Sequence, residues 1–231
     1  MSDEVLFDLQ DVSKEFVKGK ETITVFDKLN MSIAKGDFLA IMGPSGSGKT
    51  TLLNMLGGVD QPSSGEIWFD GSRIDSLSES QLAAWRANNI GFIFQFYNLM
   101  PMLNAERNVE LPLLLTRLSR GERKKNIAAA LELVSLSDRA RHMPKEMSGG
   151  QQQRVAIARA LVSDPKLLLC DEPTGDLDRQ TADEILTMLQ TLNRDYDKTI
   201  VMVTHDPAAA KYAKRTLHLD KGEFVEKDLA A

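Results

Sequence analysis

The segment 43-GPSGSGKT-50 carries the clearest chemistry in the sequence, because it fits the phosphate-binding pattern G-x-x-x-x-G-K-[ST]. Glycines let the backbone curl until its N–H groups face phosphate oxygens, and a following helix directs its positive end at the same charge. Lys49 would then reach the β- and γ-phosphates, and the Thr50 hydroxyl would hold Mg²⁺. The alternative is an ordinary glycine-rich turn between a strand and a helix, but a chance match in this chain has odds of about 1 in 100.

Two carboxylates supply the acidic element that a phosphate loop requires. They end a predicted buried strand in the run 167-LLLCDEP-173. Asp171 would help to hold Mg²⁺, and Glu172 would orient and deprotonate an attacking water. Carboxylates that leave a strand into solvent are common alone, so it is the pairing with the phosphate loop that favours these roles.

A second glycine-rich stretch, 146-EMSGGQQQR-154, begins a predicted helix in an unusual way. Ser148 is a good N-cap and Gln151 stands at the capping-box position three residues later. Gly149 and Gly150 each cost roughly 1 kcal/mol of helix propensity against alanine. Such a cost at a helix start predicts a role for the bare backbone.

Bulk composition sets limits on the function. The chain has 231 residues, of which 42% are hydrophobic and 26% charged, and its net charge of −5 disfavours a nucleic-acid binder. Cys170 is the single cysteine, which suits a reducing compartment. The acidic opening, MSDEVLFDLQ, is not expected to be a signal peptide, and no apolar run approaches the ~18 residues that cross a bilayer.

Hydrophobic periodicity predicts an α/β core around a largely parallel sheet. The middle of the chain, from about residue 97 to 162, is dominated by helical patterns and reads as an inserted subdomain. Predicted strands cover 5–12, 22–33 (one strand or two), 37–42, 66–71, 166–172 and 199–206, with a strand or turn at 216–226. Predicted helices cover 49–58, 104–115, 120–136, 151–162 and 181–196.

These motifs together resemble the nucleotide-binding subunit of ATP-binding cassette (ABC) transporters, in that family's order and over nearly the whole chain. Further matches are the Q-loop glutamine, the signature usually written LSGGQ, the D-loop, the switch histidine and two residues that pack on adenine. They are Gln95, 147-MSGGQ-151, 175-GDLD-178, His205, Phe16 and Val25. Taken singly, Gln95 and His205 could be ordinary loop residues, and a core position for Phe16 is nearly as plausible as adenine stacking. Met147 replaces the usual leucine, and Phe16 an often-found tyrosine.

The resemblance implies a P-loop NTPase core with a mostly parallel sheet, an N-terminal antiparallel β subdomain and an inserted α-helical subdomain. Residues 1–231 would form one ATP-binding domain, with the core at 1–95 and 165–231 and the helical signature subdomain at 96–164. The implied ligands are ATP and Mg²⁺. The implied catalytic residues are Glu172, His205, Gln95 and Lys49, and the implied metal-binding residues are Thr50, Gln95 and Asp171. The implied ATP-binding residues are Phe16, Val25, Gly43, Pro44, Ser45, Gly46, Ser47, Gly48, Lys49, Thr50, Thr51, Ser148, Gly149, Gly150, Gln151 and Asp178.

The same family explains the second glycine-rich stretch. Two cassettes pair head to tail in the family, so Ser148, Gly149 and Gly150 of one copy would face the γ-phosphate held by the other. A side chain at either glycine would hold that phosphate away. Gln95 would sense the metal beside the membrane-subunit contact, His205 would contact the γ-phosphate, and Asp178 would lie at the cassette interface.

At the subfamily level, 91-GFIFQFYNLMPMLNAERNVELPLLL-115 and 171-DEPTGDLD-178 are similar to lipoprotein-releasing and macrolide-exporter cassettes. The expected partners are a second copy and a four-helix permease, which would hold the chain at the cytoplasmic face of the inner membrane without nucleic acid. The stretch 96-FYNLMPML-103 is either the permease-docking patch or core packing of the helical subdomain. Lipoproteins, macrolides or peptides, and cell-division signalling without cargo, remain open. Two rivals are a soluble cassette ATPase acting on nucleic acid or ribosomes and a nonenzymatic regulator, which Glu172 disfavours.

Overall fold

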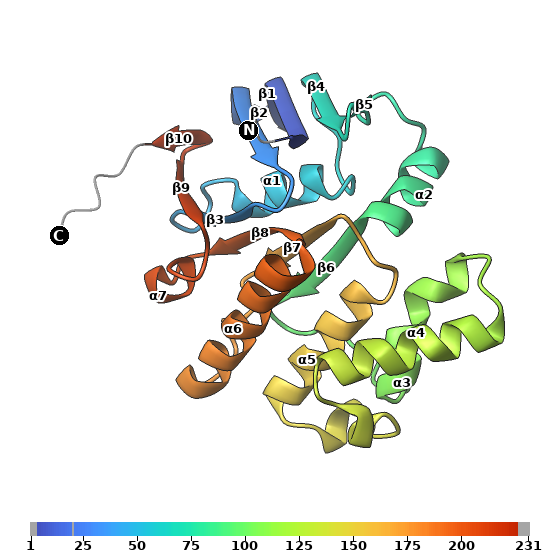
Figure 1. The fold of residues 1–231 in the computed structure, drawn as a ribbon. Helices are drawn as coiled ribbons and strands as arrows, with labels where there is room; N and C mark the ends of the chain where they lie inside the picture. The colour runs from blue at the N-terminus through green and yellow to red at the C-terminus, as the bar shows by residue number, and fades with distance from the viewer. Residues whose placement is uncertain (1–3, 20, 226–231) are drawn as a thin grey trace.

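The computed structural model describes residues 4–19 and 21–225, which fold into two β-sheets and a layer of helices (Figure 1). The first three residues of the acidic opening and Glu226, the last residue of the predicted final strand, lie outside these ranges. No helix in the described part of the chain combines the length and apolar character that crossing a membrane requires.

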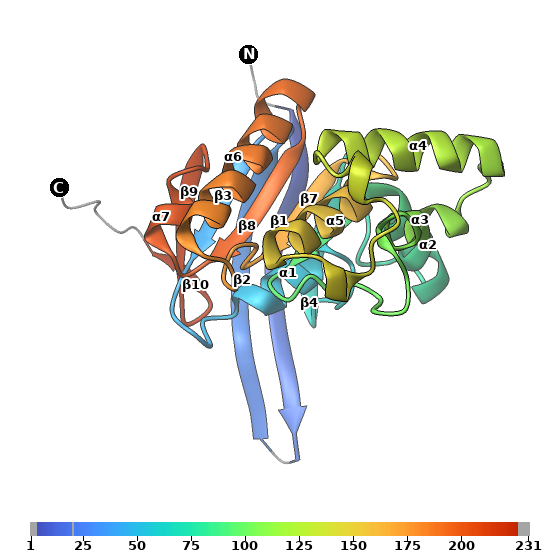
Figure 2. The same cartoon turned by 90° about the horizontal axis from the view of Figure 1, so that it is seen from below.

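The first sheet is antiparallel and is built around a long hairpin. Its strands, in the order β2-β1-β4-β5, are β2 (Glu21–Ala34), β1 (Val5–Lys18), β4 (Ser64–Phe69) and β5 (Ser72–Arg73). Both hairpin strands are longer than the sequence predicted. Their far ends project beyond the rest of the molecule (Figure 2), where apolar alternation fades and the side chains are mostly exposed.

The second sheet is parallel except for one edge strand. In the order β10-β9-β3-β8-β7-β6, its strands are β10 (Glu223–Val225), β9 (Arg215–Asp220), β3 (Phe38–Met42), β8 (Thr199–Thr204), β7 (Leu167–Asp171) and β6 (Ile90–Phe94). Only β10 pairs antiparallel, with β9. The central strands are apolar on both faces, as expected for a parallel sheet covered on both sides.

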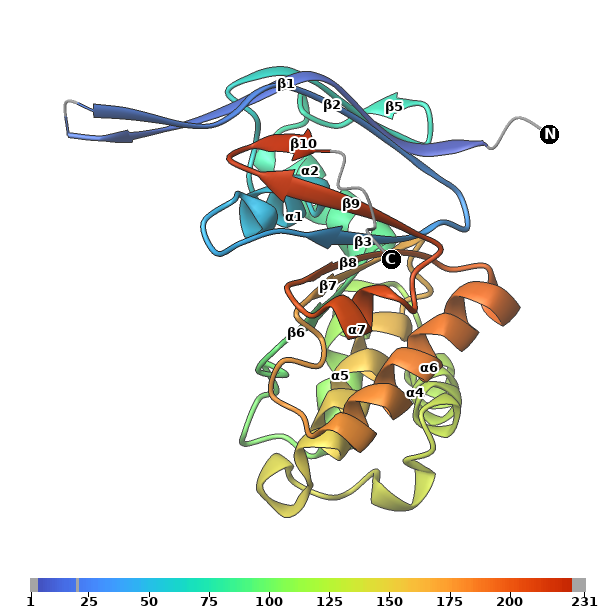
Figure 3. The ribbon, with the colours of Figure 1, turned by 90° about the vertical axis from the view of Figure 1, so that its left-hand side faces the viewer.

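Side chains alternate along the central strands into two hydrophobic clusters, one on each face of the parallel sheet. Phe38 and Ala40 point into the cluster shared with the helical layer, whereas Leu39 and Ile41 point toward the antiparallel sheet. Helix α1 (Lys49–Leu56) packs within the second cluster, so it lies between the two sheets (Figure 3). The result is a layered α/β fold with a mostly parallel sheet and an antiparallel N-terminal sheet, as the sequence predicted.

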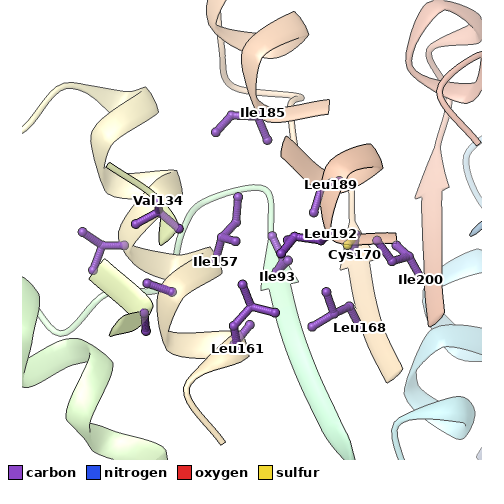
Figure 4. Close-up of a cluster of buried hydrophobic side chains, with 14 of the residues drawn as sticks. Ile93, Val134, Ile157, Leu161, Leu168, Cys170, Ile185, Leu189, Leu192 and Ile200 are labelled. Carbon is purple, nitrogen blue, oxygen red and sulfur yellow. The ribbon is translucent and has the colours of Figure 1, made fainter. Parts of the chain in front are cut away.

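The helical layer covers the opposite face of the parallel sheet. It contains α3 (Ala105–Glu110), a 3₁₀ helix (Leu111–Leu115), α4 (Arg120–Leu133), two short 3₁₀ turns (Ser137–Arg139 and Pro144–Glu146), α5 (Gly149–Leu161), α6 (Arg179–Tyr196) and α7 (Pro207–Ala210). Ile157 and Leu161 from α5 and Ile185 and Leu189 from α6 meet strand residues such as Leu168 in one cluster (Figure 4).

Besides β5, α7 and the short 3₁₀ turns, two longer elements were absent from the sequence prediction. Helix α2 (Glu79–Asn89) buries only Leu82 among its own residues, so its apolar periodicity is weak, although Ser78 and Gln81 form a full capping box. Strand β6 follows it directly at Ile90, without a turn residue to mark the boundary. The helix predicted over 104–115 is in fact α3 followed by the 3₁₀ helix, because Pro112 cannot donate to a continuing α-helix.

Two polar groups fasten the sheet at the end where its parallel strands begin. Asp70 lies 2.5 Å from the Lys166 ammonium and 2.8 Å from that of Lys35. Its hydrogen bonds to Lys166 and then Lys35 lower the pKa of Asp70 to about 2. The buried Asn193 amide donates to the carbonyls of Gly36, Asp37 and Lys198, at 3.0, 3.2 and 2.7 Å.

Candidate functional site

A cleft of about 820 Å³ opens where four parallel strands end. The strands β3, β6, β7 and β8 finish side by side, because Met42 pairs with Thr204 and Phe94 pairs with Asp171. The carboxyl ends of parallel strands are where open α/β sheets bind ligands. The cleft is lined by Val25, Ser45, Gly46, Gly48, Lys49, Thr50, Thr51, Phe94, Gln95, Phe96, Asn98, Asp171, Glu172, Val203 and His205.

The phosphate loop joins β3 to α1, as its sequence required. Gly46 and Gly48 have φ of +80° and +101°, a backbone region that glycine enters at little cost. A methyl group at Gly48 would also lie 3.0 Å from Val25 Cγ1, so the loop and the hairpin are in close contact. The Lys49 ammonium donates to the carbonyls of Gly43 and Pro44, each at 2.8 Å.

Ser47 is a buried residue within this loop. Its hydroxyl has no hydrogen-bond partner among the described protein atoms. Gly43, Pro44 and Ser47 belong to the loop but do not line the cleft.

An acidic group faces the phosphate loop across the cleft. Burial and the adjacent Glu172 raise the pKa of Asp171, and the Lys49 ammonium opposes that shift. The Glu172 carboxylate lies 2.8 Å from His205 Nδ1, and the backbone N–H of Glu172 donates to the Val203 carbonyl at 3.0 Å. Glu172 has a φ of +49°, so a non-glycine residue is held in the left-handed region at the end of β7.

Three oxygen-bearing side chains predicted to bind metal, Thr50, Gln95 and Asp171, line this one cleft. A hydroxyl, an amide and a carboxylate are the hard donors that Mg²⁺ prefers, with water completing its shell. A cation there would also offset the repulsion between the Asp171 and Glu172 carboxylates. The donor set therefore fits Mg²⁺.

The second glycine-rich stretch lies outside the cleft. Ser148 and Gln151 form the predicted capping box at the start of α5, with Ser148 exposed. A methyl group at Gly150 would lie 2.4 Å from Thr181 Cγ2, and one at Gly149 would lie 2.7 Å from the Tyr97 hydroxyl. Packing within one chain therefore gives a reason for both glycines that the sequence did not reveal.

Asp178 and Phe16 also lie away from the cleft-lining residues. Asp178 caps α6, where its carboxylate accepts hydrogen bonds from the Thr181 N–H at 3.1 Å and the Thr181 hydroxyl at 2.6 Å. Phe16 is 42% exposed on the hairpin, with the Lys14 ammonium 4.7 Å from its ring centre. It is a surface residue, not a core residue.

Helix α5 supplies supporting residues that the sequence analysis missed. The fully buried Gln153 amide donates to the carbonyls of Phe94 and Pro173, at 3.2 and 2.5 Å. Arg159 donates to the carbonyls of Tyr97 and Asn98, at 2.8 and 2.6 Å. Helix α5 carries three glutamines and two arginines, and only the fold shows that Gln153 and Arg159 are the ones that hold these carbonyls.

Comparison with known proteins agrees with this geometry. Residues 26–175 match the family model described as "ABC transporter". The chain belongs to the ABC transporter family. It is an ATP-binding subunit of that family and an ATPase.

The chain is similar to several proteins of this family along nearly its full length. It is 44% identical to the lipoprotein-releasing system ATP-binding protein LolD of Oleidesulfovibrio alaskensis, over 97% of each chain. It is 43% identical to the macrolide export ATP-binding/permease protein MacB of Marinobacter nauticus, over 98% of this chain and 35% of that protein. A dimeric, post-hydrolysis structure of the cassette MJ0796 from Methanocaldococcus jannaschii, bound to ADP and Pi, is 41% identical with a TM-score of 0.87, covering 98% of this chain and all of that one.

Proposed function

We propose that the protein is the ATP-hydrolysing motor of a transporter and works as a head-to-tail pair of cassettes. Each cleft would hold one ATP, and Ser148 of the opposite copy would close it. The observation that carries this proposal is the separation of the two motifs. Within one chain the phosphate loop lines the cleft, whereas the exposed helix start at Ser148 does not.

The chemistry follows from the groups that line the cleft. Backbone N–H groups of the loop and the Lys49 ammonium would bind the phosphates. Glu172 would accept a proton from the attacking water, because its carboxylate leaves the sheet at the cleft and is held by His205. Thr50, Gln95 and Asp171 would hold Mg²⁺, which neutralises phosphate charge when bound. Loss of the γ-phosphate removes the contacts that bridge the copies, so the pair separates.

An apolar patch suggests where a membrane partner docks. Phe96, Met100 and Met102 are 67%, 51% and 87% exposed, directly after Gln95 in the chain. The backbone of Met100 is fixed to the buried Asn108 amide of α3, which donates to its carbonyl at 3.1 Å and accepts from its N–H at 2.7 Å. The backbone of Met100 is therefore held in place, and the three side chains of the patch are exposed, as a docking surface requires.

The partner we propose is a MacB-type permease in the inner membrane, with the cassette bound at its cytoplasmic face. The similarity to LolD and to the ATP-binding part of MacB supports this choice. Lipoprotein release and drug or peptide export both fit such a pair. The cargo would contact the permease, which leaves the cassette sequence similar across these systems.

Pairing is tested with the variant Glu172→Gln in Mg-ATP. It should bind ATP, hydrolyse it very slowly and elute as a dimer in size-exclusion chromatography. Adding Ser148→Arg should return it to the monomer while ADP affinity, measured by calorimetry, stays unchanged. A Glu172→Gln variant that remains monomeric at saturating ATP, or that keeps wild-type turnover, would contradict the proposal.

Docking is tested by affinity purification from detergent-solubilised membranes. Met100→Glu and Met102→Glu, which alter exposed residues of the patch that do not line the cleft, should lose a co-purifying membrane protein and retain basal ATP hydrolysis. Tyr196→Glu is the control, since Tyr196 is also an exposed large side chain, at 54%, at the end of α6. Recovery of nucleic acid or ribosomes instead of a membrane protein would favour the rival function.

A further inference from the structure

The loop that follows Gln95 has an unusual backbone. Tyr97 and Asn98 have φ of +56° and +47°, and two consecutive non-glycine residues in the left-handed region are rare. The Arg159 guanidinium holds both of their carbonyls, and burial lowers the pKa of that guanidinium. The conformation is thus imposed by α5, which fixes where the Tyr97 ring can lie.

The Tyr97 side chain connects this loop to the segment between β7 and α6. Its hydroxyl donates to Asp176 Oδ2 at 3.0 Å. Desolvation and the Asp176 carboxylate raise the pKa of Tyr97 to about 12, so the hydroxyl remains a donor at neutral pH. The same two segments also approach each other at Gly175, where an added methyl group would lie 2.8 Å from Gln95 Nε2.

The same hydroxyl lies against the start of α5. A methyl group at Gly149 would lie 2.7 Å from the Tyr97 oxygen and 3.4 Å from Leu177 Cδ2. Three segments therefore meet at one tyrosine: the loop after Gln95, the helix start that carries Ser148, and the turn that leads to Asp178. In the proposed pair of cassettes, each of these segments has a role at the shared nucleotide or the interface.

We propose that Tyr97 is a positioning residue, whose hydrogen bond to Asp176 sets the place of Ser148 relative to Asp178. This inference rests on the proposed function, because both residues act only between paired cassettes. The contact joins a half-buried tyrosine to an exposed aspartate, so it contributes little to folding. Loss of this hydrogen bond should weaken the dimerisation of two copies, while the affinity of a single copy for nucleotide should stay unchanged.

The experiment uses the full chain with Glu172→Gln as the parent. Tyr97→Phe, Asp176→Ala and the double variant are compared by sedimentation in Mg-ATP. Each single variant should weaken dimerisation about two- to tenfold, the range for losing one hydrogen bond. The double variant should be no weaker than the singles, and Asp176→Asn, which keeps an acceptor, should recover part of the loss. ADP affinity and the thermal midpoint should match the parent.

A matched control is available elsewhere in the chain. The Tyr212 hydroxyl donates to Asp183 Oδ1 at 3.1 Å, so Tyr212→Phe breaks the same kind of bond away from these segments. It should leave dimerisation unchanged. The inference is overturned if Tyr97→Phe dimerises like the parent, if the two losses multiply, or if Tyr212→Phe weakens dimerisation equally. A parent that never dimerises would instead reject the proposed function, and this inference with it.

Discussion

Replacing Gly150 with alanine tests the packing reason for the signature glycines. The new methyl group would meet Thr181 Cγ2 at 2.4 Å, and a gap below 3.0 Å forces one of the two to move. Thr181 cannot turn freely, because its hydroxyl donates to Asp178 at 2.6 Å and its N–H is bound to the same carboxylate. The substitution should therefore push α5 away from the start of α6.

The expected magnitude is a balance of two effects. Overpacking of this kind costs about 1–3 kcal/mol. Alanine offers up to about 1 kcal/mol of helix propensity over glycine. The net loss should be about 1 kcal/mol, which lowers the melting temperature of a chain this size by about 2–4 °C. Thr181→Ser removes the obstructing methyl group and keeps the hydroxyl, so Gly150→Ala with Thr181→Ser should regain the lost stability.

Urea unfolding of the two single variants and the double variant measures this balance. Gly150→Ala as stable as the wild type, or no recovery in the double variant, would refute the packing argument. ATP hydrolysis by the double variant then separates the two reasons for the glycine. A stable but inactive double variant means that a bound phosphate also needs the bare backbone, whereas an active one means that packing alone requires Gly150.

Three other outcomes are expected. Lys49→Ala should lose ATP binding by equilibrium dialysis, and hydrolysis with it; wild-type turnover would exclude the phosphate loop as the site. Gln153→Ala should cost about 2–4 kcal/mol in urea unfolding, since two carbonyls lose their donor, and should reduce kcat, whereas Asn193→Ala should cost as much stability without changing kcat. Asp70→Asn should be less stable than wild type at pH 7, because a pKa lowered from 3.8 to about 2 stabilises the fold above both values. That difference should shrink as the pH falls from about 4 through 2, and a difference that at pH 2 is still as large as at pH 7 would rule out the ion pairs as its source.

The order of the strands and helices around the cleft could be predicted where a short apolar run leads directly into a recognisable motif, as it does at the ends of β3 and β7. Met42 ends β3 just before the phosphate loop, and Asp171 ends β7 just before Glu172. Strand β6 was the exception, since its glycine and aromatic residues were noted only as part of a motif. The length of the hairpin was missed because its outer half has no buried face to impose a pattern.

The supporting contacts could not be predicted, because they join residues far apart in the sequence through backbone carbonyls. Gln153 and Arg159 bond to groups that every residue possesses, so nothing in the sequence identifies their partners. The Tyr97 contact with Asp176 likewise depends on a left-handed backbone that no local residue type demands. Long-range polar contacts of this kind are visible only once the strands are aligned.

The alternation of Phe38 and Leu39 along β3 has a consequence for dissecting the molecule. Successive residues of the central strands pack into opposite hydrophobic clusters, so each of these strands contributes to both clusters. A fragment that keeps the phosphate loop but omits residues 96–164 would lose α5, which packs against β6, so it would expose buried apolar residues such as Ile93 and should aggregate. The nucleotide-binding core and the helical layer therefore share the same buried strands and form one folding unit.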